Sequence, residues 1–292
     1  MIDLHMHTTC SDGLDHPNKL LQKAEEKGLE LISITDHNNA LAYENINRNI
    51  FSGGIIQGVE IATSFEGHII EILAYGIDID IINEWYRNFY SDENLAYNEE
   101  ELFKRILNIL DNLGVKYTDG LRIPNIEKGI SKKTIYYDII KYKENKKKLP
   151  ENTFGSYKKF FRQGLANPES FLFCSEGDFY PNLEDVIYLI KKAGGLAFFA
   201  HLFEYQVTDH FEFLNRLLKT VKIDGLECYH SVYTNDNIKN MIEYANKNNY
   251  YISGGSDYHG KPHRNVELGV GKGQLEIPKS IIDDWIHKVD LI

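Results

Sequence analysis

Cysteine is scarce in this chain, and its three copies, Cys10, Cys174 and Cys228, are widely spaced. An odd number of scattered cysteines provides no disulfide framework. Long apolar stretches are also missing, and none approaches the length that spans a bilayer. The first residues lack a basic segment followed by an apolar run, so we expect no secretory signal there. These absences predict a cytoplasmic protein that does not contact a membrane.

Positive charge is also in short supply. The chain has 32 Lys and Arg against 43 Asp and Glu, a net charge of -11, which argues against a general nucleic-acid binder. The balance is uneven, because residues 101–165 hold 15 basic and 7 acidic side chains, so that 17 and 36 remain elsewhere. An acidic body suits a protein that cages divalent cations, and the basic segment could attract an anionic substrate. We therefore expect a small anionic substrate rather than long nucleic acid.

Two histidines near the start of the chain are the first sign of a metal site. In residues 2–7 apolar and polar side chains alternate, which predicts a short strand with His5 and His7 on one face. Two imidazoles aimed at one point form a pair of metal ligands. A His-x-His motif alone is equally compatible with two structural histidines.

The same arrangement recurs four more times along the chain. Apolar runs at residues 31–35, 55–59, 195–200 and 250–256 each predict a buried strand and lead into polar side chains. These side chains are Asp36, His37, Glu60, His201, Asp257 and His259. Because five strand ends deliver His, Asp or Glu, coincidence is a poor explanation, and the mixture of N and O donors suits Zn, Mn or Fe.

The two ends of the chain differ from its middle in the secondary structure that their patterns predict. At both ends, strands alternate with helical segments at residues 17–28, 183–193, 211–221 and 238–249, which predicts an α/β fold with a largely parallel sheet. We also expect a helix near residues 41–50 and a hairpin element at 67–76. Residues 80–182 contain no histidine and show mainly helical spacing. We interpret them as an inserted helical cap.

Six motifs together resemble one known family. In chain order they are His-x-His, Ser-Asp-Gly, Thr-Asp-His, Gly-Val-Glu, Ala-His and Ser-Asp-x-His. This set resembles the PHP (polymerase and histidinol phosphatase) superfamily. The inserted middle is most similar to its capped subgroup, which includes nucleoside 3′,5′-bisphosphate phosphatases. The resemblance implies a distorted (β/α) barrel of residues 1–79 and 183–292, with residues 80–182 as the inserted helical cap.

The resemblance also implies a centre of up to three divalent metal ions. On the family pattern His5, His7, Glu60 and Asp257 hold the first metal. Glu60 bridges to the second, which His201 also binds. The third is held by Asp12, His37 and His259.

One position departs from the pattern, because Glu71 stands where the family usually has histidine. We expect Glu71 to bind the second metal through oxygen, which could favour Mn or Fe over Zn. His68, three residues away on the same strand, should face the opposite side. The alternative is an incomplete second site, with a binuclear or inactive centre.

The chemistry implied is hydrolysis of a phosphate monoester, such as a nucleoside 3′,5′-bisphosphate, by a hydroxide that bridges the metals. Glu60 and Asp257 would lie at the reacting centre, and His230, at a further strand end, could be a general acid or a phosphate contact. Candidate substrate contacts are Lys261, His263 and Arg264 after the last motif, and Arg122, Lys132, Lys133 and Arg162 in the cap.

Three other functions compete with this one. The first is an amidohydrolase acting on C–N bonds, which would normally use a lysine where Glu60 stands. The second is a binding or regulatory protein whose catalysis is impaired by Glu71, although every other ligand is retained. The third is a PHP-type exonuclease that acts on short oligonucleotides.

Overall fold

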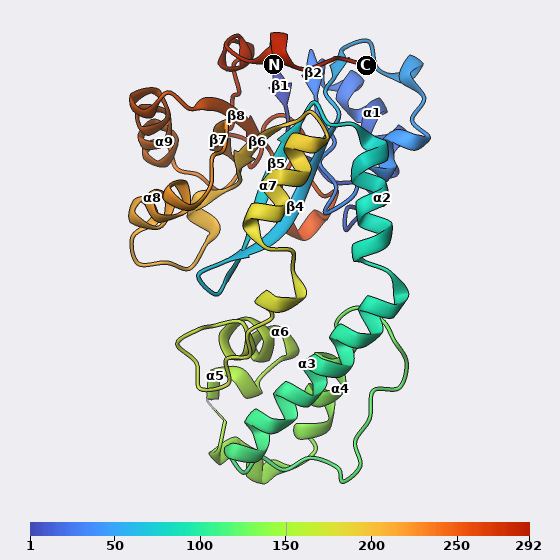
Figure 1. The fold of residues 1–292 in the computed structure, drawn as a ribbon, viewed down its shortest axis with the longest axis vertical. Coiled ribbons are helices and arrows are strands. Elements are labelled where there is room, and N and C mark those ends of the chain that lie inside the picture. The colour runs from blue at the N-terminus through green and yellow to red at the C-terminus, as the bar shows by residue number, and fades with distance from the viewer. Residues whose placement is uncertain (150) are drawn as a thin grey trace. The chain divides into compact units, whose positions relative to one another are not determined.

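The computed structural model describes residues 1–149 and 151–292, without the side chains of Glu151, Asn152 and His263. The chain forms two compact units (Figure 1). Unit 1 combines Met1–Tyr86 with Pro181–Ile292, and unit 2 is Arg87–Tyr180. Within the described part of the chain, no helix has the length and apolar character of a membrane span.

Unit 1 is built on two sheets rather than on one. The first is parallel and consists of three two-residue strands, β1 (Ile2–Asp3), β2 (Leu31–Ile32) and β3 (Gly54–Ile55). The second has the order β4 (Gly58–Phe65), β5 (His68–Tyr75), β6 (Leu196–Phe199), β7 (Gly225–His230) and β8 (Tyr251–Gly255). It is mixed, because the hairpin of β4 and β5 makes two of its pairings antiparallel. The expectation of a largely parallel sheet is therefore met only in part.

Hydrogen bonds join the two sheets at both edges. Beyond β1, the Leu4 N–H donates to Gly254 O (3.2 Å) and the Asp257 N–H donates to His5 O (2.9 Å). Beyond β2, the Asn38 N–H donates to Glu60 O (2.7 Å). The described residues thus form an α/β fold whose sheets meet through isolated bridges, and no continuous closed barrel ladder is present among them. These junctions bring the ends of β1, β4 and β8 together.

Four helices cover the sheets of unit 1, and the sequence predicted all four. They are α1 (Pro17–Glu26), α7 (Leu183–Lys192), α8 (His210–Thr220) and α9 (Asn235–Asn248). Their ends are set by local chemistry: Pro17 occupies the first turn of α1, and a reciprocal capping box between Thr234 and Asn237 starts α9. Helix α7 packs against β4 and β6, and α9 packs against β7 and β8.

The prediction of one helix near residues 41–50 is wrong. Two short 3-10 helices, Leu41–Glu44 and Arg48–Ile50, occupy this segment instead. The side chain of Asn47 accepts a hydrogen bond from the Asn49 N–H and so caps the second of them. Short polar side chains that bond nearby backbone groups compete in this way with a continuous helix.

An aromatic cluster closes unit 1 near its C-terminus. The ring of Trp285 stacks on Tyr75 at 5.5 Å and lies 5.1 Å from the Phe198 ring. The Trp285 indole N–H donates to Ile252 O, and the Tyr75 hydroxyl donates to Leu4 O. Both polar groups are thereby satisfied within an apolar core, as buried groups require. The cluster ties β5, β6 and β8 to the segment that carries His5.

Unit 2 is helical and has a hydrophobic core of its own. Its helices are α3 (Asp92–Asn112), α4 (Ile130–Ile139), α5 (Glu151–Phe154) and α6 (Tyr157–Lys159), and α2 (Ile79–Phe89) enters it from unit 1. The buried face of α3 carries Leu102, Ile106 and Leu110 at helical spacing, as the sequence predicted. A buried carboxylate, Glu99, accepts hydrogen bonds from the backbone and hydroxyl of Ser131.

Candidate metal centre

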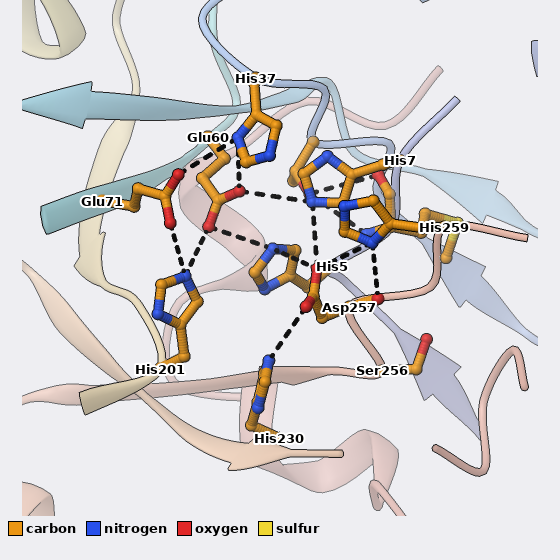
Figure 2. Close-up of polar contacts among 12 residues, drawn as sticks. His5, His7, His37, Glu60, Glu71, His201, His230, Ser256, Asp257 and His259 are labelled. Carbon is orange, nitrogen blue, oxygen red and sulfur yellow. Dashed lines mark hydrogen bonds and ion pairs between the residues drawn. The ribbon is translucent and has the colours of Figure 1, made fainter. Parts of the chain in front are cut away.

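Polar side chains from widely separated parts of the chain converge where the strands of unit 1 end (Figure 2). The structure brings together all nine residues that the sequence predicted as metal ligands. They are His5, His7, Asp12, His37, Glu60, Glu71, His201, Asp257 and His259. Figure 2 shows most of them pointing toward the carboxylates of Glu60 and Asp257.

Glu60 lies at the centre of this cluster and is almost fully buried. Its Oε1 lies 2.9 Å from Nε2 of His201 and 3.2 Å from Nε2 of His5. Its Oε2 lies 3.0 Å from Nδ1 of His37 and 3.3 Å from Nε2 of His7. Each oxygen therefore faces two imidazoles, which is the geometry of a carboxylate able to bridge two cations.

Asp257 occupies the other side of the cluster. Its Oδ1 lies 3.3 Å from Nε2 of His7 and 3.3 Å from Nδ1 of His259. Its Oδ2 lies 3.7 Å from Nε2 of His230, which is fully buried, and 3.2 Å from an Arg264 nitrogen. The backbone of Asp257 is left-handed, with φ 54°, and its N–H donates to His5 O. This turn directs the carboxylate back over the end of β1.

Glu71, the residue that departs from the family pattern, points into the cluster. Its Oε2 lies 3.1 Å from Nε2 of His201, and its Oε1 lies 3.3 Å from Nδ1 of His37. His68, also on β5, lies against the ring of Phe213 at 5.5 Å instead. The alternation of side chains along the strand thus brings Glu71 to the histidines and leaves His68 outside.

Asp12 and His37 connect the cluster to its more exposed side. Oδ1 of Asp12 lies 2.9 Å from Nε2 of His259 and 3.6 Å from Nε2 of His37. Its Oδ2 accepts a hydrogen bond from Lys261 at 2.6 Å. His37 therefore presents one ring nitrogen to Asp12 and the other to Glu60 and Glu71, so it faces two groups of ligands rather than one.

The electrostatics of the cluster are those of a cation site. Burial lowers the pKa of His7, but Asp257 and Glu60 outweigh it and raise this pKa to about 9. Burial raises the pKa of Glu60, yet His5 and His37 hold it well below its usual range. Opposite charges stabilise both ionised forms when they lie this close. The Glu60 carboxylate therefore stays ionised and able to bind cations.

Several buried ring nitrogens in the cluster are left without a hydrogen bond among the described residues. These atoms are Nε2 of His5, both nitrogens of His7, Nδ1 of His201, Nε2 of His230 and Nε2 of His259. Buried polar atoms are normally hydrogen-bonded, so such orphans point to a missing partner. Four sets of three or four donor atoms each lie within 4.8 Å of one another. The donors fit divalent metal ions.

Three buried carboxylates support the cluster, and the sequence had indicated Asp36 among them, as a polar residue at a strand end. Asp3 accepts hydrogen bonds from Ser256 and the Gly269 N–H, and Asp36 accepts them from Thr8 and Ser11. Glu227 accepts one from His5 and one from the His201 backbone. Glu227 could have been recognised from the sequence, because an acidic residue stands there within an apolar strand, Leu226-Glu227-Cys228.

The predicted substrate contacts fall into separate places. Lys261 and Arg264 lie in the cluster and pair with Asp12 and Asp257. The side chain of His263 lies outside the described residues. Arg122, Lys132, Lys133 and Arg162 belong to unit 2. Lys132 is largely buried there in an ion pair with Glu176 at 2.7 Å, which gives it a structural role within that unit.

Comparison with known proteins extends the likeness over nearly the whole chain. Residues 3–253 match the family model of the PHP domain. The 5′-3′ exoribonuclease Rnm of Salmonella typhimurium is 28% identical over 295 residues, which cover 97% of this chain and 92% of that protein. The 3′,5′-nucleoside bisphosphate phosphatase of Chromobacterium violaceum is 22% identical, covering 92% and 90%. A solved metal-dependent phosphoesterase from Bifidobacterium adolescentis has a TM-score of 0.61 at 20% identity, covering 99% and 96%.

Proposed function

The chain belongs to the PHP domain family and is a metal-dependent phosphoesterase, and we propose that it breaks the phosphoester bond at the 3′ oxygen of a 5′-phosphorylated nucleotide. The smallest such substrate is a nucleoside 3′,5′-bisphosphate, and a larger one is the 5′ end of a short RNA. The cluster of donors around Glu60 carries this proposal, because its geometry suits chemistry at phosphorus.

Two of the activities named among the relatives can break the same kind of bond. A 3′,5′-bisphosphate phosphatase that removes the 3′ phosphate breaks the bond between phosphorus and the 3′ oxygen. A 5′-3′ exoribonuclease that releases a nucleoside 5′-phosphate breaks the same kind of bond in the RNA chain. The negative net charge of this protein argued for a small substrate. Recognition of a single terminal nucleotide is compatible with that charge, because it requires few contacts to the rest of an RNA.

The proposed metal assignments follow the pattern of the PHP family, and the distances in the cluster are compatible with them. His5, His7 and Asp257 would hold the first ion together with Glu60. Glu60, Glu71 and His201 would hold the second, with Glu71 favouring Mn or Fe over Zn. Asp12, His37 and His259 would hold the third. When bound, such ions would supply positive charge for the phosphoryl oxygens and lower the pKa of water, so that hydroxide is available to attack phosphorus near neutral pH.

His230 is the proposed general acid. Its Nδ1 accepts a hydrogen bond from the Val232 N–H, so its proton is on Nε2, the atom that faces Asp257. As water adds to phosphorus and the bond to the 3′ oxygen breaks, that oxygen needs a proton. Nε2 of His230 can donate it.

Lys261 and Arg264 are the proposed contacts for the second phosphate. Both side chains reach the cluster from the loop after His259. Arg264 is half-buried and its guanidinium can bind two phosphate oxygens at once, whereas Lys261 acts as a point charge. A contribution of Arg162 from unit 2 remains a prediction.

A substrate panel tests the proposal. Metal-free protein is reloaded with Mn²⁺ and given adenosine 3′,5′-bisphosphate, histidinol phosphate and a ten-nucleotide RNA with either a 5′ phosphate or a 5′ hydroxyl. We expect adenosine 5′-phosphate from the bisphosphate and nucleoside 5′-phosphates from the 5′-phosphorylated RNA, with slower attack on the 5′-hydroxyl RNA. Release of nucleoside 3′-phosphates, or hydrolysis of histidinol phosphate alone, would overturn it. Glu60→Gln protein is the control for contaminating nucleases.

A further inference from the structure

Glu227 is a buried carboxylate that contacts two of the ligand histidines without joining the cluster around Glu60. It lies inside β7 and has no exposed surface. Its Oε1 accepts a hydrogen bond from Nδ1 of His5 at 2.8 Å. Its Oε2 accepts one from the backbone N–H of His201 at 2.7 Å. Each oxygen thus serves a residue from a different strand end, and the two residues belong to different ligand groups.

The contact with His5 decides which ring nitrogen can bind a cation. A neutral imidazole carries its proton on one nitrogen and a lone pair on the other. Because a carboxylate can only accept, Glu227 holds the proton on Nδ1 of His5. The lone pair is then on Nε2, which lies 3.2 Å from Oε1 of Glu60 and makes no hydrogen bond in the described chain. Carboxylate partners of this kind orient ligand histidines and raise their basicity.

The contact with His201 holds a strained piece of backbone. His201 has φ 24° and ψ 54°, outside the regions that residues with a side chain normally adopt. Such a conformation persists only where its surroundings fix it. The bond to Glu227 fixes the His201 peptide at the end of β6. From there Nε2 of His201 reaches Glu60 at 2.9 Å and Glu71 at 3.1 Å (Figure 2).

We propose that Glu227 is a positioning residue that sets the metal affinity of two ligand groups together, the one containing His5 and the one containing His201. Glu227 also forms a close donor set with His5 and His230, but in this role its two oxygens stay on the N–H groups of His5 and His201. One carboxylate thereby links the loading of the first ion to the loading of the second. The inference rests on the proposed metal assignments, but not on the identity of the substrate.

The substitution Glu227→Gln separates this role from simple packing. Glutamine keeps the size of the side chain but offers one acceptor oxygen where two acceptors are needed. If its amide N–H faces His5, the proton of His5 must move to Nε2 and the ligand lone pair is lost. If it faces His201, two donors meet and the strained peptide is released. Loss of a carboxylate partner of this kind weakens metal binding by about 10- to 100-fold.

Metal binding is measured by equilibrium dialysis of metal-free protein against increasing Zn²⁺, with the bound metal counted. For Glu227→Gln we expect at least one of the ions to bind about 10- to 100-fold more weakly. The matched control is Glu99→Gln, which removes a buried carboxylate hydrogen-bonded to Gly129 and Ser131 in unit 2. It should bind Zn²⁺ like the unchanged protein. Equal binding by the Glu227→Gln and unchanged proteins would overturn the inference.

A second measurement uses the unchanged protein and so does not depend on folding of a variant. In ¹⁵N NMR spectra of the histidine rings, Nδ1 of His5 should carry the proton, and the Nε2 signal should shift when Zn²⁺ is added. A proton on Nε2 with a Zn²⁺-dependent shift of Nδ1 would refute the role of Glu227. Neither experiment contains a substrate. Both would therefore still test the role of Glu227 if the proposed nucleotide substrate were wrong.

Discussion

The substitution Glu60→Gln should cost the protein two metal ions at once, and thermal unfolding can measure that cost. Each carboxylate oxygen of Glu60 faces imidazoles of two ligand groups, and the amide that replaces it is a poor ligand. A cation at 100 times its dissociation constant stabilises the folded state by about 2.7 kcal/mol. Loss of two such ions therefore removes about 5 kcal/mol of metal-dependent stabilisation.

The expected change in melting temperature follows from the size of unit 1. This unit has roughly 200 residues, and a domain of about that size shifts by about 2–4 °C for each kcal/mol. The rise in melting temperature on adding metal should thus be about 10–20 °C smaller in Glu60→Gln than in the unchanged protein.

Differential scanning calorimetry of both proteins, each with and without Mn²⁺, gives this rise directly. Taking the rise within each protein cancels the effect of the substitution on the metal-free state. Glu66→Gln, at the exposed turn between β4 and β5, is the matched control because the ion pair that Glu66 makes among the described residues is with Arg216. An undiminished rise in Glu60→Gln would refute the bridging role of Glu60.

Four further predictions concern single groups in the site. Arg264→Ala should raise KM for the bisphosphate about 10- to 100-fold with a smaller change in kcat, because a hydrogen bond to a charged group contributes about 1.5–3 kcal/mol; steady-state kinetics would contradict this if only kcat fell. His230→Gln should lower kcat by about 10²- to 10⁴-fold while the counted metal stays constant, and a parallel loss of metal would make His230 a ligand instead. Glu71→His should shift competitive loading from Mn²⁺ toward Zn²⁺, and unchanged selectivity would count against Glu71 as a ligand. Metal binding at pH 7 should release protons, because the pKa of His7 is raised to about 9 without metal and a histidine ligand must be neutral. Metal affinity should therefore rise with pH up to about that value. If the binding enthalpy measured by calorimetry did not differ between buffers of different ionisation enthalpy, no protons would be released and the reasoning would be wrong.

Part of the ligand set was predictable from local pattern, because His201 and Asp257 each follow a buried strand, whereas Asp12 and Glu71 were indicated by the family resemblance. The strand predicted at residues 55–59 was wrong in its bounds, because β3 ends at Ile55 and Glu60 lies inside β4, near its start. The two-residue period of β5 placed Glu71 and His68 on opposite faces, and the family resemblance indicated that Glu71 faces the ligands.

The supporting groups could not be predicted, because their roles depend on contacts between distant residues. Glu227 and His5 are 222 positions apart, and no local pattern pairs them. The hairpin element expected at residues 67–76 is longer than predicted, because it includes β4 from Gly58 and turns at Glu66 and Gly67, where both residues have positive φ. The 3-10 helices after Leu41 reflect side-chain capping, which apolar periodicity does not reveal.

The hydrogen bond from the Asp257 N–H to His5 O has a consequence for synthesis of the protein. The first ligands leave the ribosome early, but the strand that completes their group is made 250 residues later, after the whole of unit 2. At about 5–20 residues per second this interval is roughly 10–50 s. Unit 2, whose core is continuous in sequence, can fold during that time. His5 and His7 stay exposed to chaperones and stray metals until β8 arrives, so metal loading should come last in the maturation of this protein.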